Sequence, residues 1–107
     1  MTLAKRRNET EVQVTPPDEI GNGSATVSTP GTAVPLSATS VGCRFVNVFA
    51  KATNDGNVFV GGSTVSNISG AVLEQARCTE WFGIDDLSKV FVDAETGGDG
   101  VQYIYVV

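Results

Sequence analysis

The side chains best suited to chemistry in this 107-residue chain are carboxylates near its C-terminal end. Asp85 and Asp86 are adjacent, and Asp93, Glu95 and Asp99 surround a glycine-rich segment. Clustered carboxylate oxygens can bind a cation such as Ca²⁺. Adjacent residues of a strand point to opposite faces, however, so Asp85 and Asp86 converge only if a turn brings them together. We expect a turn at Asp85–Asp86 and a solvated hairpin tip at the other three, with a cation site there as the alternative.

The chain contains no histidine. This excludes Ser-His-Asp and Cys-His nucleophile systems and every His-ligated metal site. The glycine-rich segments 61–63 and 97–100 lead into no expected helix, so they lack the helix N-terminus that binds phosphate in glycine-rich loops. We therefore expect a protein that is not an enzyme, with no catalytic residue, no cofactor and no metal.

Cys43 and Cys78 are the two cysteines, and both lie in apolar segments. Two thiols without histidine do not make a structural zinc site. We expect buried free thiols, with a single disulfide as the alternative.

Trp81 and Phe82 are the aromatic pair with the clearest potential for binding. An exposed Trp can stack on a sugar ring, but a single Trp in a small domain more often belongs to the core or anchors an interface. Adjacent strand residues face opposite sides, so only one of the two can point outward. We predict that Trp81 and Phe82 contact a partner.

The elements that must position these residues are strands. Val, Thr and Ile make up 31 of the residues, against four Leu and one Met, and β-branched side chains favour pleated strands. Turn signals separate short strands expected at 25–28, 33–36, 44–52, 57–60, 71–73, 78–84, 89–94 and 101–107. The segment Asn54-Asp55-Gly56 predicts a tight hairpin joining 44–52 to 57–60, and Pro35 predicts a sheet edge for 33–36. The expected fold is all-β, a small antiparallel β-sandwich or jelly-roll-like domain.

The last expected strand, 101–107, has no charge, proline or glycine. On an open sheet edge such a strand would pair with other chains. We expect it to lie in the middle of a sheet or under another subunit. Because the strand 89–94 is also apolar on both faces, we expect a homo-oligomer.

The first 23 residues differ in composition from the remainder and predict an extended N-terminal arm (1–23) before the sandwich domain (24–107). The formal net charge is −5, so a basic face for nucleic acid is excluded. No segment is apolar enough for a membrane helix, and no apolar run follows the basic residues as in a signal peptide. The arm residues that we expect to contact a partner are Lys5, Arg6, Arg7, Val12 and Val14.

Three blocks of the sequence resemble small virion proteins of tailed bacteriophages. They are NVFVGGSTVS (57–66), IDDLSKVFVDA (84–94) and GDGVQYIYV (98–106). With the strand at 44–52, the resemblance covers residues 30–107. The segment 71–83 departs from it, because a shorter polar turn is expected there, and the arm 1–23 has no counterpart.

The resemblance implies a capsid decoration (cement) protein of the virion surface, made in the host cytoplasm, that binds the major capsid protein and stabilises the head. Its partners would be the capsid protein and further copies of itself in a homotrimer, with no nucleic acid and no membrane. The alternative that it leaves open is a head-fibre, tail or baseplate module that binds host glycans through Trp81.

Overall fold

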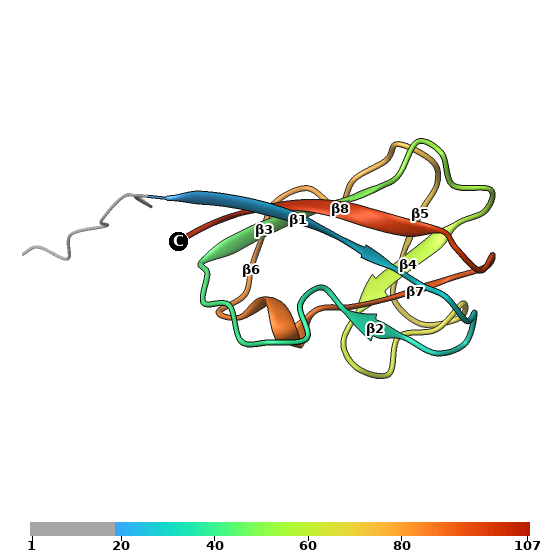
Figure 1. Cartoon of the computed structure of the whole chain (residues 1–107), viewed down its shortest axis with the longest axis horizontal. Coiled ribbons are helices and arrows are strands. Elements are labelled where there is room, and N and C mark those ends of the chain that lie inside the picture. The colour runs from blue at the N-terminus through green and yellow to red at the C-terminus, as the bar shows by residue number, and fades with distance from the viewer. Residues whose placement is uncertain (1–18) are drawn as a thin grey trace, which may run out of the picture.

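A computed structural model describes residues 19–107, which form two four-stranded antiparallel sheets (Figure 1). The strands are β1 (Ile20–Thr26), β2 (Val34–Pro35), β3 (Phe45–Ala50), β4 (Val58–Gly61), β5 (Ala71–Leu73), β6 (Phe82–Gly83), β7 (Phe91–Ala94) and β8 (Gly100–Val106). Among these residues the one helical element is the 3₁₀ turn η1 (Leu87–Lys89). No helix within 19–107 is long and apolar enough to cross a membrane. The all-β sandwich expected from the sequence is confirmed.

The strand order is β1-β8-β3-β6 in the first sheet and β2-β7-β4-β5 in the second. The first strand therefore pairs with the last, the second with the last but one, and so on, as in one long hairpin whose closing turn is residues 62–70. The pairs are β1 with β8, β2 with β7, β3 with β6 and β4 with β5. The hairpin is rolled up so that successive strands alternate between sheets, except at β4–β5. This eight-stranded, two-sheet arrangement is a jelly roll.

The core lies between the sheets and is built from β-branched side chains. Val46 and Val48 of β3 and Val101 of β8 are fully buried from the first sheet, and Val58 and Val92 are fully buried from the second. Branched side chains pack well on a pleated surface. Each fully buried Val contributes about 1.5–3 kcal/mol relative to an exposed one.

The predicted hairpin between 44–52 and 57–60 is wrong. β3 pairs with β8 and β6, whereas β4 pairs with β5 and β7 in the other sheet. The connecting loop crosses between the sheets because Asp99 accepts hydrogen bonds from the N–H groups of Asp55 and Gly56, at 2.8–3.1 Å. A contact with a residue more than forty positions away thus overrides the local turn signal.

Two other expectations about strand positions are confirmed. β2 contains Pro35 and lies at the edge of its sheet, and β8 lies between β1 and β3 (Figure 1). The central position of β8 protects its backbone from pairing with other chains.

The first strand begins earlier than expected from the sequence. Ile20 pairs with Val106 of β8, and Val107 N–H donates to the Glu19 carbonyl at 2.9 Å. Residues 20–23, which the sequence placed in the arm, therefore belong to the sandwich, and the C-terminus lies beside the start of β1 (Figure 1).

Candidate interaction surface

The side of the first sheet that faces away from the core carries a continuous set of uncharged side chains. Alternation along the strands and the register of β1, β8 and β3 define its members. This outer face consists of Ile20, Asn22, Ser24 and Thr26 of β1, Gln102, Ile104 and Val106 of β8, and Phe45, Asn47 and Phe49 of β3.

Several large apolar side chains of the outer face are open to solvent. Ile20 is 73% exposed and Phe45 is 47% exposed, and both lie next to Val106 in the register. Phe49 and Ile104 are half-buried. Contiguous exposed apolar groups of this kind mark interaction sites more often than singly scattered ones do.

The outer face is hollowed near its middle. A depression of about 490 Å³ lies between Asn22, Phe49, Gln102 and Ile104. Asn47 is only 7% exposed although it belongs to this face, and its Oδ1 accepts a hydrogen bond from the Thr79 hydroxyl at 3.4 Å. A partner would therefore meet a hollowed, uncharged surface that combines apolar side chains with amide and hydroxyl groups.

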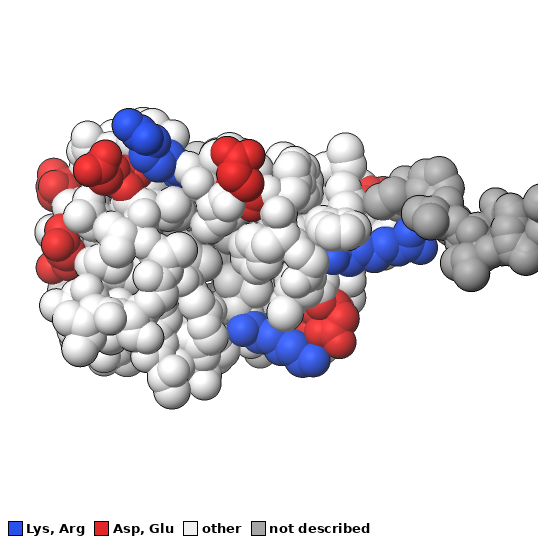
Figure 2. Space-filling view, turned by 180° about the vertical axis from the view of Figure 1, so that it is seen from behind, with Lys and Arg blue, Asp and Glu red and all other residues white. Residues whose placement is uncertain are grey.

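Charged side chains are also sparse on one whole side of the described residues. Figure 2 shows, on the side opposite to the view of Figure 1, acidic and basic groups spread singly or in small clusters around a wide uncharged area. Long-range electrostatic steering of a partner is therefore weaker than it would be for a surface of one strong sign.

Trp81 and Phe82, predicted from the sequence to contact a partner, have different surroundings. Phe82 packs against the core, whereas Trp81 is 47% exposed. Just before them the segment 76–79 pairs with β3, and Glu80 adopts a φ of 67° between this segment and β6. The irregularity at Glu80 separates the segment 76–79 from β6, so the expected strand 78–84 is regular only at Phe82–Gly83.

Phe82 also lines a second hollow, of about 430 Å³, which includes residues of both sheets. Its apolar lining also includes Val60, Ile84 and Val90, and the Lys89 side chain borders the hollow. The Trp81–Phe82 segment thus combines an exposed ring with an apolar hollow that could accept a partner's side chain.

The three carboxylates expected at a solvated hairpin tip are placed differently. β7 and β8 belong to different sheets, so residues 95–99 form a crossing turn and not a hairpin tip. Asp93 is 2% exposed and Asp99 is 5% exposed. Asp93 accepts from Gly31 N–H at 2.9 Å, and Glu95 accepts from Asn57 N–H at 2.9 Å. The expectation of solvation is wrong for Asp93 and Asp99, because backbone N–H groups of neighbouring loops occupy these carboxylates.

Within residues 19–107 no three His, Cys, Asp or Glu side chains are close enough together to hold a metal ion. In the crossing turn, Asp99 is directed to the loop after β3 and Asp93 to the turn after β1. Each of these carboxylates fixes a loop.

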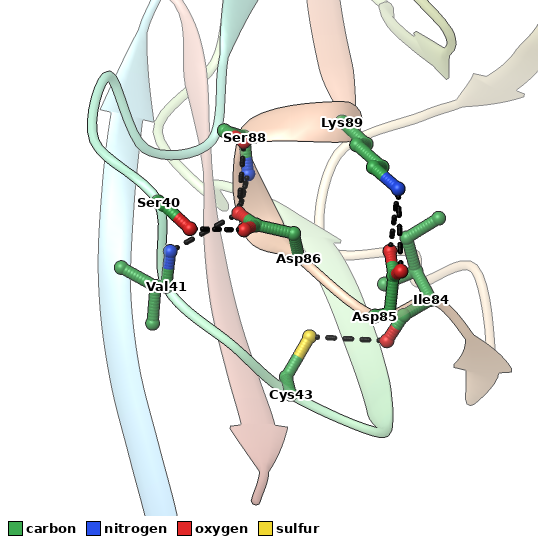
Figure 3. Close-up of polar contacts among 8 residues, drawn as sticks. All are labelled: Ser40, Val41, Cys43, Ile84, Asp85, Asp86, Ser88 and Lys89. Atoms are coloured by element: carbon green, nitrogen blue, oxygen red, sulfur yellow. Dashed lines mark hydrogen bonds and ion pairs between the residues drawn. The ribbon is translucent and has the colours of Figure 1, made fainter.

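Asp85 and Asp86 lie at the bend that leads into η1, where the sequence predicted a turn, and their side chains diverge (Figure 3). Asp86 caps η1: its carboxylate accepts from the Ser40 hydroxyl, from Ser88 N–H at 2.9 Å and from Val41 N–H at 3.0 Å. These hydrogen bonds, of which the one from Ser40 has the largest effect, hold the pKa of Asp86 well below its usual range. Asp85 instead forms an exposed ion pair with Lys89 at 2.9 Å.

Both cysteines are free, as expected from the sequence, but each is half-buried where a buried thiol was expected. Cys43 donates to the Ile84 carbonyl at 3.2 Å (Figure 3). Burial, and then the charges of Asp86 and Asp85, raise the pKa of the Cys43 thiol. A raised pKa keeps the thiol protonated and unreactive at neutral pH.

The outer face was not predicted from the sequence, which singled out Trp81 and Phe82 instead, and their contact with a partner stays a prediction. The strand β3 has apolar residues at both alternating positions, so its pattern could not separate the buried valines from the outward Phe45 and Phe49. The predicted arm contacts Lys5, Arg6, Arg7, Val12 and Val14 lie outside the described residues.

Comparison of the chain with protein-family models, with curated proteins and with solved structures gives no match in any of the three.

Proposed function

We propose that this chain is a structural protein of a tailed-bacteriophage particle, a capsid decoration protein that binds the major capsid protein and stabilises the head. The observation that carries the proposal is the outer face of the β1-β8-β3 sheet, where uncharged side chains, including Ile20 and Phe45, are exposed on a rigid scaffold. A protein that serves by binding needs such a surface and no reacting groups.

The sequence blocks at 57–66, 84–94 and 98–106 support the same proposal through their resemblance to phage virion proteins. These blocks contribute β4, the segment from Ile84 to β7, and β8. The jelly roll also recurs in viral capsid and lectin domains. A fold alone does not fix a function, so the support for decoration comes from the exposed side chains of the outer face.

Decoration also suits the energetics of weak contacts repeated over a shell. A single small interface gives modest affinity, but several linked contacts raise the overall affinity by orders of magnitude. The net charge of −5 disfavours adhesion of the protein to packaged DNA.

A binding assay on purified phage heads tests the role of the outer face. Phe45→Asp places a charge among its apolar groups, and we expect binding to fall by about tenfold or more, as for a central interface residue. Val72→Asp is the matched control, because Val72 is 55% exposed on β5 of the other sheet. Equal binding by the two variants, with both folded, contradicts the assignment of the outer face.

A second candidate function, glycan binding by a fibre, tail or baseplate module, is favoured by the half-exposed ring of Trp81. Trp81→Ala separates the two. Loss of binding to host cells or glycans, with binding to heads retained, supports the glycan-binding module. Loss of binding to heads supports decoration.

A further inference from the structure

Within residues 19–107, β1 is an edge strand of the first sheet, and it differs from the other three edge strands. It has seven residues, whereas β2 and β6 have two each and β5 has three. It contains neither proline nor a charged residue, and β2 includes Pro35. Sheet edges are normally protected from pairing by shortness, proline or charge. β1 has none of these protections.

The backbone groups at this edge can be identified from the ladder with β8. Val107 N–H donates to Glu19 O, and Val27 N–H donates to Asp99 O, each at 2.9 Å. Hydrogen-bonded pairs alternate along an antiparallel ladder. The odd-numbered residues of β1 therefore bond to β8, and Ile20, Asn22, Ser24 and Thr26 direct their N–H and C=O groups away from it.

We propose that β1 pairs antiparallel with β1 of a second copy of this chain, which makes one continuous eight-stranded sheet. In the centred register, Asn22 and Ser24 of one copy face Ser24 and Asn22 of the other. Ile20 then faces Thr26 at both ends. The arrangement is isologous, since each copy supplies the same groups to the other. It takes the place of the homotrimer expected from the sequence.

The side chains near the axis favour a second copy as the occupant. The two Gly23 residues face each other at the axis, on the core side, where neither has a Cβ. An added Cβ there would lie 2.4 Å from the Tyr103 hydroxyl oxygen, so on that side the Tyr103 ring of the same copy lies over Gly23, and Gly23 itself adds no side chain at the axis. On the outer side, Asn22 faces Ser24 and Ile20 faces Thr26, so no charged side chain meets another there.

The charges are also compatible with two acidic copies. Glu19, which directly precedes β1, is the acidic residue nearest to the pairing strands, and in this register it lies opposite Val27 of the second copy. The two Glu19 residues are then eight positions apart along the strand, about 26 Å at 3.3 Å per residue, which exceeds the screening length of about 8–10 Å at physiological salt. The two outer faces become neighbours, so the pair offers a capsid a doubled binding surface.

The mass of the full chain in solution tests this pairing, by light scattering over a concentration series. Ser24→Pro removes an N–H that β8 does not use, and proline is tolerated at a free sheet edge. We expect a dimer for the wild type and for Ser24→Thr, and a monomer for Ser24→Pro.

Asn22→Glu is the second variant, in case Ser24→Pro does not fold. It places two like charges on diagonal positions beside the axis, whereas Asn22→Gln adds no charge. We expect Asn22→Glu to weaken the dimer by about tenfold or more and Asn22→Gln to leave it intact. Amide hydrogen exchange at Thr26 should be slow in the dimer and fast in both Ser24→Pro and Asn22→Glu, and exchange at Ser24 should be slow in the dimer and fast in Asn22→Glu.

Three results overturn the pairing: a monomeric wild type at the highest concentrations, a trimer, or a dimer that neither Asn22→Glu nor a folded Ser24→Pro weakens. Because the experiment uses the chain alone, its outcome is separate from that of the head-binding assay.

Discussion

Asn54 and Gly100, 46 residues apart, are joined by two hydrogen bonds: the Asn54 Nδ2 donates to the Gly100 carbonyl at 2.9 Å, and Gly100 N–H donates to the Asn54 Oδ1 at 3.0 Å. Asn54 is 1% exposed, so water cannot replace either bond. This pair ties the loop between the two sheets to the start of β8, at the end of the sandwich opposite to the start of β1 and the C-terminus (Figure 1).

Asn54→Ala should lower the free energy of unfolding by about 2–3 kcal/mol, because it leaves the buried Gly100 N–H without its partner and removes the hydrogen bond from Asn54 to the Gly100 carbonyl. Chemical denaturation measures the change. Asn67→Ala is the control, since Asn67 is exposed on the turn between β4 and β5, and it should change stability by less than about 0.5 kcal/mol. Equal effects of the two substitutions would show that the Asn54–Gly100 bonds do not fix the loop.

Gly100→Ala should destabilise the protein more strongly than Asn54→Ala. A Cβ at position 100 would lie 2.2 Å from the Ala25 carbonyl oxygen, so β1 must shift to make room. We expect a loss of about 3 kcal/mol or more, at the upper end for overpacking. Gly62→Ala is the matched control, because no atom lies within 4 Å of the Cβ position there. Thermal unfolding of both variants distinguishes them, and similar melting temperatures would contradict the close approach of β1 and β8.

Asp99→Asn should destabilise the fold because it replaces an acceptor with a donor opposite the N–H groups of Asp55 and Gly56. The expected loss is about 1–3 kcal/mol, the cost of an unsatisfied buried group. Asp55→Asn, at an exposed position of the same loop, removes the same charge and should change little. A loss shared by both variants would point to net charge and not to the buried contact.

The stability that Asp86 contributes should depend on pH. Its pKa is lowered in the folded protein by the hydrogen bonds from Ser40, Ser88 and Val41, so this contribution is fully present above the unfolded-state pKa of about 3.9. It is lost as the pH falls below about 4 toward the folded-state pKa. Denaturation between pH 7 and pH 2 should therefore show a smaller acid-induced loss for Asp86→Asn than for the wild type. Parallel curves for the two proteins would rule out this role of the cap.

Local patterns in the sequence predicted the strands well because alternation and turn residues act over a few positions. β8 illustrates this: its uncharged, glycine-free run indicated a protected strand, and it lies between β1 and β3. The pairing of β3 with β4 failed because Asn54 and Asp99 act across more than forty residues, and no local pattern contains that contact.

The candidate surface was only partly predictable for a related reason. Trp81 stands out in any sequence as the single tryptophan, and it is half-exposed. Phe45 and Phe49 do not stand out, since they alternate with the equally apolar Val46 and Val48. Which of the two sets faces the core is decided by how the sheets pack, and this depends on residues of β7 and β8 far along the chain.

The proposed decoration of a phage head is tested most directly by counting the copies of this chain in purified phage particles. Quantitative mass spectrometry against the major capsid protein gives that number. Decoration of the head predicts hundreds of copies per particle, in a fixed ratio to the capsid protein. A handful of copies, as for a tail or fibre component, or none at all, would contradict the proposal that this protein stabilises the shell.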